Sequence, residues 1–99
     1  MALIFHVTTS EAWNEALAKG SYRHPSLEKE GFIHCCEERQ LPGVLERYFA
    51  GMRDLIRLVI DTDKLKSKWV MEWSPATADH FPHIYGPIDP DAVTMVLPI

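Results

Sequence analysis

The segment most informative about the fold is Leu55-Ile56-Arg57-Leu58-Val59-Ile60-Asp61. Successive side chains of a strand point to opposite faces, and here both sets of positions are apolar except at Arg57. A strand that is covered on both faces has this pattern. Residues 61–64 follow as a polar turn. We therefore predict a central strand at residues 55–61 and place the other elements around it.

Shorter strand patterns lie on both sides of this segment. Residues 69–73 alternate between large apolar side chains on one face and Val70 and Glu72 on the other. A loop is expected over residues 74–82, because it begins with a Ser-Pro pair. Further strands are predicted at residues 2–8, 32–36, 83–85 and 92–97.

Two helices are predicted. The first begins at a cap formed by Thr9 or Ser10 and ends at Lys19, before a glycine. The segment from residue 20 to residue 31 is polar and irregular. The second helix has apolar residues at the spacing of one helix face, namely Leu41, Val44, Leu45, Tyr48 and Phe49. Together the elements predict an α+β fold with a mixed, mostly antiparallel sheet of about six strands.

Length and composition set the broad class. A chain of 99 residues forms one domain, residues 1–99, and 46% hydrophobic with 24% charged residues is ordinary for a folded protein. No apolar run approaches the roughly 20 residues of a membrane span, and the first residues lack a signal-peptide pattern. We therefore expect a cytoplasmic protein that does not bind membranes. A net charge of −4 with scattered Lys and Arg argues against bulk nucleic-acid binding, but allows one nucleotide in a pocket.

The two cysteines and a histidine pair bear on metals and disulfides. Cys35 and Cys36 are sequence neighbours, so two free thiols are expected rather than a strained disulfide. His80 and His83 have a spacing that suits two metal ligands, but no clear third or fourth ligand lies beside them. No metal site is predicted.

The most informative polar residues are histidines inside apolar, strand-like runs. His6 lies within residues 3–8, His34 within residues 31–36, and His83 within residues 81–86. A half-buried imidazole needs partners for its ring nitrogens and titrates near neutrality. Several such rings on neighbouring strands predict a polar pocket. For His6 the alternative is a core imidazole that is satisfied by a backbone carbonyl, and for the block around His83 it is the end of a loop.

Other residues extend this candidate pocket. Thr8 shares a strand face with His6 and adds a hydroxyl group, and Glu72 is the only acid inside an apolar strand pattern. For Glu72 the alternative is a solvent-facing position on a half-exposed strand. Arg23, His24 and Ser26 lie in the loop before the second strand. Loops that are held by a rigid scaffold often contact ligands. The alternative for Arg23 and His24 is simple exposure to solvent.

Several of these blocks, in this order, resemble the small bacterial family known as domain of unknown function 952 (DUF952). The most specific blocks are Gly-Phe-Ile-His-Cys at residues 31–35 and Phe-Pro-His-Ile-Tyr-Gly-Pro at residues 81–87. A serine usually follows the His-Cys pair in this family, and Cys36 stands there in this chain. The resemblance covers nearly the whole chain, through residues 4–8, 22–23, 25–27, 30–35, 58–61, 72 and 81–87.

The resemblance implies a fold and a set of roles. DUF952 has been grouped with the ADP-ribosyltransferase-like fold, whose enzymes use NAD in a cleft of a small split sheet. By that likeness His6 holds the NAD ribose, and His34 lines the nicotinamide or phosphate side. Glu72 or a residue of a C-terminal loop takes the place of the catalytic glutamate. NAD is then a substrate, and no bound cofactor is predicted. The ligand-binding candidates are Thr8, Arg23, Ser26, His83 and Tyr85, of which Tyr85 stacks on the nicotinamide.

Three functions follow from these observations. The first is an NAD-binding or ADP-ribose-binding protein, or an enzyme of the ADP-ribosyl-transfer type. The second is a two-histidine phosphoesterase, because His6-Val7-Thr8 and His34-Cys35-Cys36 form an imperfect pair of His-x-Ser/Thr motifs. The third is a small interaction module without catalysis. Nucleotide folds with a Gly-x-Gly-x-x-Gly or Walker loop are not supported, since neither motif is present. The oligomeric state is left open.

Overall fold

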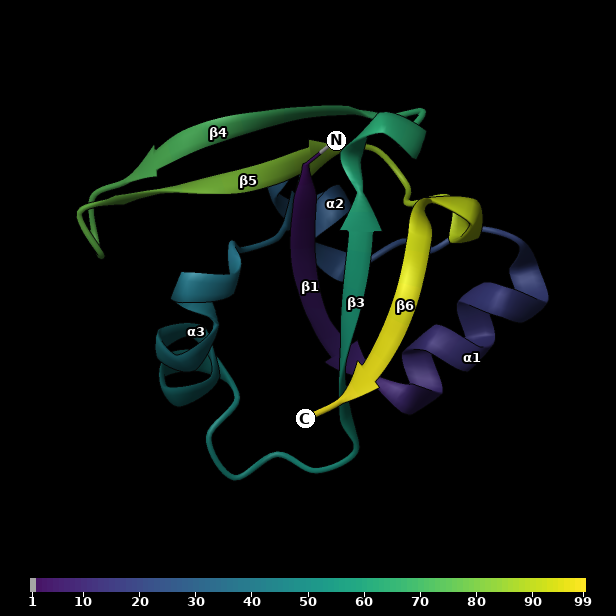
Figure 1. Cartoon of the computed structure of the whole chain (residues 1–99), viewed down its shortest axis with the longest axis horizontal. Helices are drawn as coiled ribbons and strands as arrows, with labels where there is room; N and C mark the ends of the chain where they lie inside the picture. Colours follow the sequence, from purple (N-terminus) through teal and green to yellow (C-terminus); the bar gives the residue numbers. More distant parts are fainter. Residues whose placement is uncertain (1) are drawn as a thin grey trace.

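The computed structural model describes residues 2–99 and contains two antiparallel sheets of three strands each. The first sheet has the order β1 (Leu3–Thr9), β3 (Leu55–Asp61), β6 (Val93–Pro98). The second has the order β2 (Ile33–His34), β5 (Asp79–Tyr85), β4 (Lys68–Ser74). A single bridge between Phe5 and Cys36 joins the two sheets. In Figure 1 the β4–β5 hairpin crosses the ends of β1 and β3.

Helices flank the sheets. They are α1 (Ser10–Lys19), α2 (Pro25–Glu30) and α3 (Leu41–Tyr48), and short 3₁₀ turns cover Glu38–Gln40, Thr62–Lys64 and Pro90–Ala92. Figure 1 shows α1 and α3 on opposite sides of the first sheet, with α2 behind the upper end of β1. The predicted α+β class with six mostly antiparallel strands is thus confirmed. Three helices are present where two were predicted.

The central strand is confirmed as β3, which lies between β1 and β6. Its alternate side chains supply two apolar clusters on opposite faces of the sheet. Leu58 and Ile60 are fully buried in the larger cluster with Trp13 and Ile33. Val59 belongs to the smaller cluster on the other face. Apolar residues at both sets of positions are therefore explained by packing on both faces.

The first helix begins and ends where its cap residues predicted. The Thr9 side chain accepts a hydrogen bond from the backbone N–H of Ala12, and Gly20 ends the helix in the left-handed conformation with φ of 84°. In α3 the predicted stripe packs against the smaller cluster through Leu41, Val44, Leu45 and Phe49, whereas Tyr48 of the same stripe is 64% exposed.

Two segments differ from the sequence predictions. Residues 25–30, expected to be irregular, form the six-residue helix α2, in which proline takes a first-turn position and His24 is the N-cap. One turn and a half is too short to show a helical period. The strand predicted at residues 83–85 begins at Asp79, because residues 79–82 pair with residues 71–74 of β4. By contrast, the second strand contains only residues 33–34.

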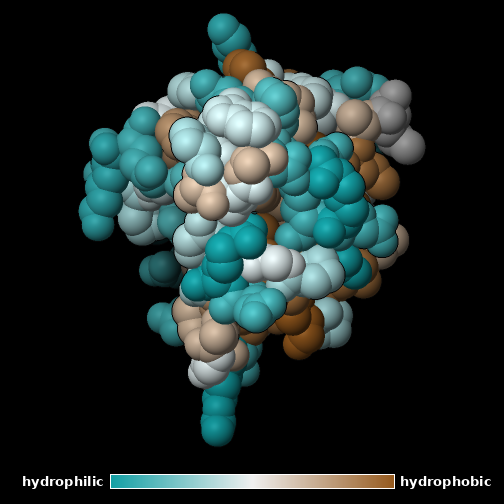
Figure 2. Space-filling model, turned by 90° about the vertical axis from the view of Figure 1, so that its left-hand side faces the viewer, coloured by the Kyte–Doolittle hydropathy of each residue, from teal (hydrophilic) through white to brown (hydrophobic). Residues whose placement is uncertain are grey.

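The molecular surface on the side of α3 and the outer end of the β4–β5 hairpin is mostly hydrophilic, with separate apolar patches (Figure 2). Within residues 2–99, none of the helices has the length and apolar content needed to cross a bilayer.

Candidate functional site

A buried hydrogen-bond network surrounds His6. The ring is 3% exposed, and its Nδ1 lies 2.6 Å from the backbone oxygen of His34. Its Nε2 lies 2.8 Å from the hydroxyl oxygen of Tyr22, which in turn lies 3.0 Å from Oγ1 of Thr8. The network therefore connects β1 to the end of β2 and to the loop after α1.

Burial decides the protonation state of this network. Desolvation lowers the pKa of His6 to about 4, so the ring is neutral at physiological pH and carries one N–H. The carbonyl oxygen of His34 only accepts hydrogen bonds, which assigns that N–H to Nδ1. Nε2 is then the acceptor for the Tyr22 hydroxyl. Burial also raises the pKa of Tyr22 to about 12, which keeps the phenol protonated.

A cavity of about 450 Å³ opens beside this network. Thr8 and Tyr22 line it from the network side, and Lys19, Arg23 and His24 supply positive or titratable groups. His6 itself does not line the cavity. The lining thus combines hydroxyl groups and cations with one carboxylate, Glu15, and several apolar side chains. Cations of this kind can pair with a phosphate group.

The outer edge of β1 also faces this cavity. The backbone N–H and C=O of Phe5 both bond with Cys36, away from β3. Backbone groups of a strand alternate in direction, so those of Val7 point to the same outer edge. Val7 is 5% exposed and lines the cavity, and within residues 2–99 its backbone has no hydrogen-bond partner at that edge. A donor and an acceptor are thus presented side by side at the cavity wall.

A second polar cluster lies on the hairpin formed by β4 and β5. The carboxylate of Glu72 is 2.9 Å from Nδ1 of His83 and also accepts a hydrogen bond from the hydroxyl of Tyr85. The hydrogen bonds from Tyr85 and His83 lower the pKa of Glu72, so the carboxylate is ionised at neutral pH. The same contact raises the pKa of Tyr85. The Glu72 side chain is 37% exposed and that of His83 12% exposed.

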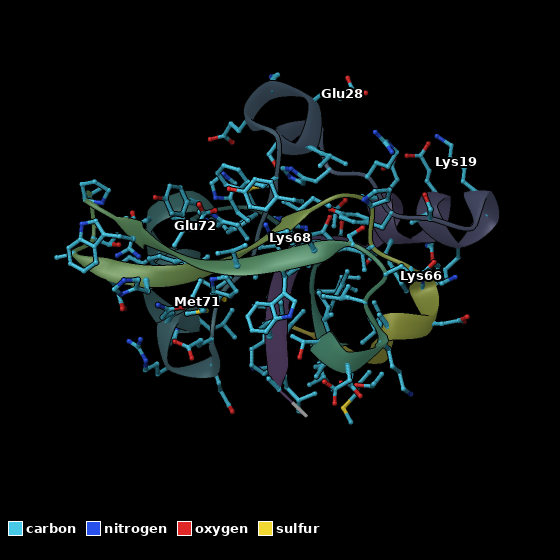
Figure 3. The ribbon with its side chains drawn as sticks, turned by 90° about the horizontal axis from the view of Figure 1, so that it is seen from above. Lys19, Glu28, Lys66, Lys68, Met71 and Glu72 are labelled. Atoms are coloured by element: carbon cyan, nitrogen blue, oxygen red, sulfur yellow. The ribbon has the colours of Figure 1, made fainter. Side chains whose placement is uncertain are left out.

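Aromatic rings extend this cluster toward α2. Phe32 stacks on His83 with ring centroids 4.0 Å apart and an interplanar angle of 19°. The ring of His34 meets His83 edge-on at 5.3 Å, and its Nε2 lies 2.8 Å from a carboxylate oxygen of Glu30. Figure 3 shows Glu72 and Met71 on opposite sides of β4, with α2 on the side of Glu72.

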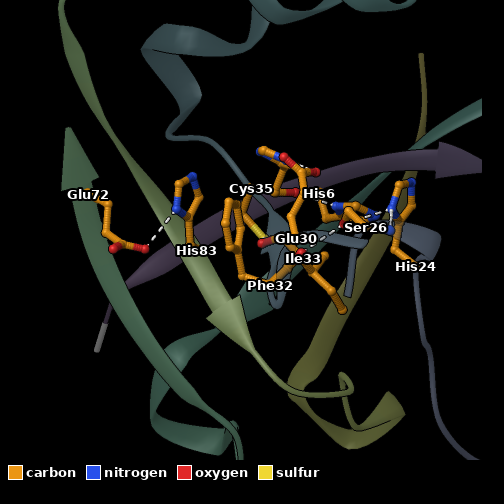
Figure 4. Close-up of polar contacts among 10 residues, drawn as sticks. His6, His24, Ser26, Glu30, Phe32, Ile33, Cys35, Glu72 and His83 are labelled. Carbon is orange, nitrogen blue, oxygen red and sulfur yellow. Dashed lines mark hydrogen bonds and ion pairs between the residues drawn. The ribbon is translucent and has the colours of Figure 1, made fainter. Parts of the chain in front are cut away.

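The two clusters form one row. His24 meets His6 edge-on at a centroid distance of 5.4 Å, and burial followed by the nearby charge of His34 lowers the pKa of His24. Figure 4 shows the row from Glu72 and His83 at one end, past Phe32 and Glu30, to His24 at the other. The row therefore joins the cation-lined cavity to the ionised carboxylate.

The predicted site residues fall into four groups. His6 and Thr8 belong to the buried network, and Arg23 lines the cavity. Ser26 is buried, donates to the backbone oxygen of Phe32 and bonds to His24, so it holds the start of α2 in place. The remaining candidates lie together at the second cluster, namely His34, Glu72, His83 and Tyr85.

Sequence reasoning missed several members of the row as site residues. Tyr22 bonds to His6 across 16 positions of sequence, and Glu30 bonds to His34 across the turn between α2 and β2. Phe32, which shares a strand face with His34 by alternation, was the one whose position was foreseeable. Tyr22 has no comparable local signal, because only the tertiary fold brings it to His6.

The cysteines do not take part in this site. Cys35 and Cys36 are free and buried, as predicted from their adjacency. Burial raises the pKa of Cys36 to about 11 and that of Cys35 well above its usual range. Cys36 packs in the smaller apolar cluster. Among residues 2–99 no group of three or more His, Cys, Asp or Glu side chains is arranged to hold a metal ion.

Residues 7–96 match the family described as protein of unknown function DUF952. The chain belongs to the DUF952 family. The fold is also that of protein CC0527 from Caulobacter crescentus: its crystal structure has 26% sequence identity and a TM-score of 0.88 over 98% of this chain and 85% of that chain. The crystal structure of a double mutant of CC0527 gives 24% identity with the same TM-score and coverage. The solution NMR structure gives 27% identity and a TM-score of 0.77, over 97% and 83% of the two chains. No curated protein matches the sequence.

Proposed function

We propose that this DUF952 protein binds NAD or a related ADP-ribose compound and breaks its nicotinamide–ribose bond. The observation that carries the proposal is the Glu72 carboxylate, which is ionised and fixed by Tyr85 and His83 on an open face. Two small antiparallel sheets joined at one bridge also agree with the split sheet of the ADP-ribosyltransferase-like fold.

The role of Glu72 is electrostatic. Cleavage of a ribosyl C–N bond passes through a sugar with positive charge, which a preorganised carboxylate stabilises. Because two donors already hold the Glu72 carboxylate, little reorganisation is needed when that charge develops. The ring centroids of Phe32 and Tyr85 lie 5.5 Å apart, and Tyr85 contacts the Glu72 carboxylate. The two rings offer flat apolar surface to a nicotinamide ring.

The cavity serves the rest of the ligand. Lys19 and Arg23 supply cations for a pyrophosphate, and the hydroxyl groups of Thr8 and Tyr22 are suited to a ribose. The unpaired N–H and C=O of Val7 complement an amide or a purine edge, as an edge strand does for an added strand. In this arrangement His6 orients Tyr22 rather than contacting the ligand.

The reaction balances without a further cofactor. The C–N bond electrons leave with neutral nicotinamide, and the oxygen of water or of an acceptor hydroxyl bonds to the ribose carbon. The acceptor's proton passes to a base and then to solvent. With water as acceptor, the products are ADP-ribose, nicotinamide and one proton.

Ligand titrations test the binding. Thermal shift and NMR titrations with NAD, ADP-ribose, nicotinamide and 2′,3′-cyclic AMP detect weak binders, because stabilisation grows as RT ln(1 + [L]/Kd). We expect NAD and ADP-ribose to bind and Arg23→Ala to weaken both by roughly 10-fold. Arg53→Ala is the matched control, since Arg53 lines a different surface hollow. Nicotinamide release from NAD, followed by chromatography, then tests turnover.

The outcomes separate the three hypotheses. Absence of both NAD and ADP-ribose binding would refute the proposal. Hydrolysis of the cyclic nucleotide would favour the phosphoesterase instead, although the geometry supports it less, because His6 is saturated and Cys36 packs in the other apolar cluster. No binding of any of the four compounds would favour a non-catalytic interaction module.

A further inference from the structure

Glu30 lies where helix stability does not explain it. It is the last residue of α2, and a carboxylate at a helix C-terminus is disfavoured by the helix dipole. Gly31 then adopts the left-handed conformation with φ of 89° and turns the chain into β2. This turn brings Glu30 to His34, with Oε2 and Nε2 2.8 Å apart.

This contact fixes the hydrogen on one ring nitrogen. A carboxylate only accepts hydrogen bonds, so a neutral His34 carries its N–H on Nε2. Nδ1 is then the basic nitrogen, and within residues 2–99 it has no hydrogen-bond partner. In the neighbouring pair of His83 and Glu72 the ring nitrogens have exchanged roles, because Nδ1 of His83 is the nitrogen that contacts the carboxylate. Two imidazoles 5.3 Å apart are thus each oriented by a separate carboxylate.

We propose that Glu30 is a positioning residue that orients His34, and that Nδ1 of His34 is the base that deprotonates the acceptor. The inference rests on the function proposed above and names a residue which that function did not use. As the acceptor oxygen bonds to the ribose carbon, its O–H bond breaks and the proton passes to Nδ1. Glu30 stabilises the imidazolium that forms. This is the base-and-orienter arrangement of other acid–base sites.

The position of His34 suits this role. Its side chain is 53% exposed, so an acceptor reaches it from solvent. It lies against His83, which contacts Glu72, so base and charge-stabilising carboxylate are separated by one imidazole ring. Glu30 is 50% exposed, and an exposed ion pair of this kind adds little to stability. A catalytic effect is therefore separable from a folding effect.

NMR of the free protein tests the orientation. Long-range ¹H–¹⁵N spectra of the histidine rings at pH 9 report which nitrogen carries the hydrogen, and His34→Gln assigns the signals. We expect a single Nε2–H form with ring contacts to Phe32 and His83 in the wild type. Glu30→Ala is expected to give an averaged ring with both tautomers and weaker ring contacts. Glu28→Ala, an exposed carboxylate of the same helix, is the matched control.

Turnover of NAD tests the chemical role. Glu30→Ala is expected to lower kcat by about 10-fold to 100-fold at unchanged KM, the range of losses observed when a carboxylate that orients a metal-binding histidine is removed. Glu30→Gln retains an oxygen acceptor and is expected to recover part of that loss, while Glu28→Ala has the wild-type rate. An unchanged His34 ring in Glu30→Ala would overturn the positioning role. An unchanged kcat in Glu30→Ala would overturn the base role and leave the proposed NAD cleavage standing. A wild type without any turnover of NAD would overturn the proposed function and the base role together.

Discussion

His6 and His83 are both strand histidines with apolar sequence neighbours, yet the fold gives them opposite surroundings. His6 is 3% exposed, and both of its ring nitrogens have protein partners. His83 contacts Glu72 through one nitrogen, within a cluster whose carboxylate and Tyr85 reach solvent. A saturated imidazole has no free nitrogen to offer a ligand. Unused hydrogen-bonding capacity at an exposed position, rather than residue type, therefore distinguishes the end of the row at which we propose the chemistry occurs.

The largest expected effect is on turnover at the exposed cluster. Glu72→Gln removes the charge that, in the proposed reaction, stabilises the ribosyl cation, but it retains the shape of the side chain, so kcat is expected to fall by roughly 10²-fold to 10³-fold. Binding of ADP-ribose and the thermal midpoint are expected to stay unchanged, because the side chain is partly exposed. Stopped assays of nicotinamide release with parallel thermal-shift titrations measure both. Equal turnover in Glu72→Gln would contradict the electrostatic role.

The next effect concerns the pH dependence of stability at His6. The folded pKa of about 4 lies below the unfolded value of 6.5, so the unfolded chain binds more protons as pH falls. The stabilisation is complete above the unfolded pKa and is lost progressively between pH 6.5 and pH 4. From pH 7 to pH 5 the free energy of unfolding is expected to fall by roughly 2 kcal/mol through this residue.

Urea unfolding at pH 7 and pH 5 measures that loss. His6→Gln lacks the titrating ring and is expected to show a correspondingly smaller change over the same interval. The lowered pKa values of Glu72 and Asp79 change the free energy of unfolding mainly below pH 5. The lowered pKa of His24 also reduces stability as the pH falls, but it does so in the wild type and in His6→Gln alike. If His6→Gln does not fold, NMR titration of the wild-type ring decides: protonation of His6 above pH 6 would contradict a buried, neutral imidazole.

The sequence predicted those parts of the fold whose signals are local and periodic. β3 has apolar residues at both strand faces, and α1 has a cap and a terminal glycine, so each was placed correctly. Residues 25–30 make a helix of only about a turn and a half, which shows no helical period and begins at the His24 cap. Pairing with β4, which no local pattern encodes, extends β5 back to Asp79.

For the candidate site, the sequence indicated the polar residues and left their partners undetermined. Imidazoles in apolar strands pointed to His6, His34 and His83, and all three lie in one row. Which of them retains a free nitrogen depends on residues distant in sequence. Tyr22 saturates His6 across 16 positions, and Glu72 reaches His83 only through the pairing of β4 with β5. Alternation predicts a strand face but does not identify its neighbours on other strands.

The smallest expected effect comes from removing one hydroxyl from each region. Tyr22→Phe leaves the buried Nε2 of His6 without a donor and is expected to cost about 1 to 2 kcal/mol of unfolding free energy. Tyr85→Phe removes a donor from an exposed carboxylate, so the unfolding midpoint is expected to stay unchanged while turnover falls. Urea unfolding and nicotinamide release on both variants form the comparison. A destabilised Tyr85→Phe beside an unaffected Tyr22→Phe would reverse the assignment of structural and functional regions, because the exposed hydroxyl would then be the one that the fold requires.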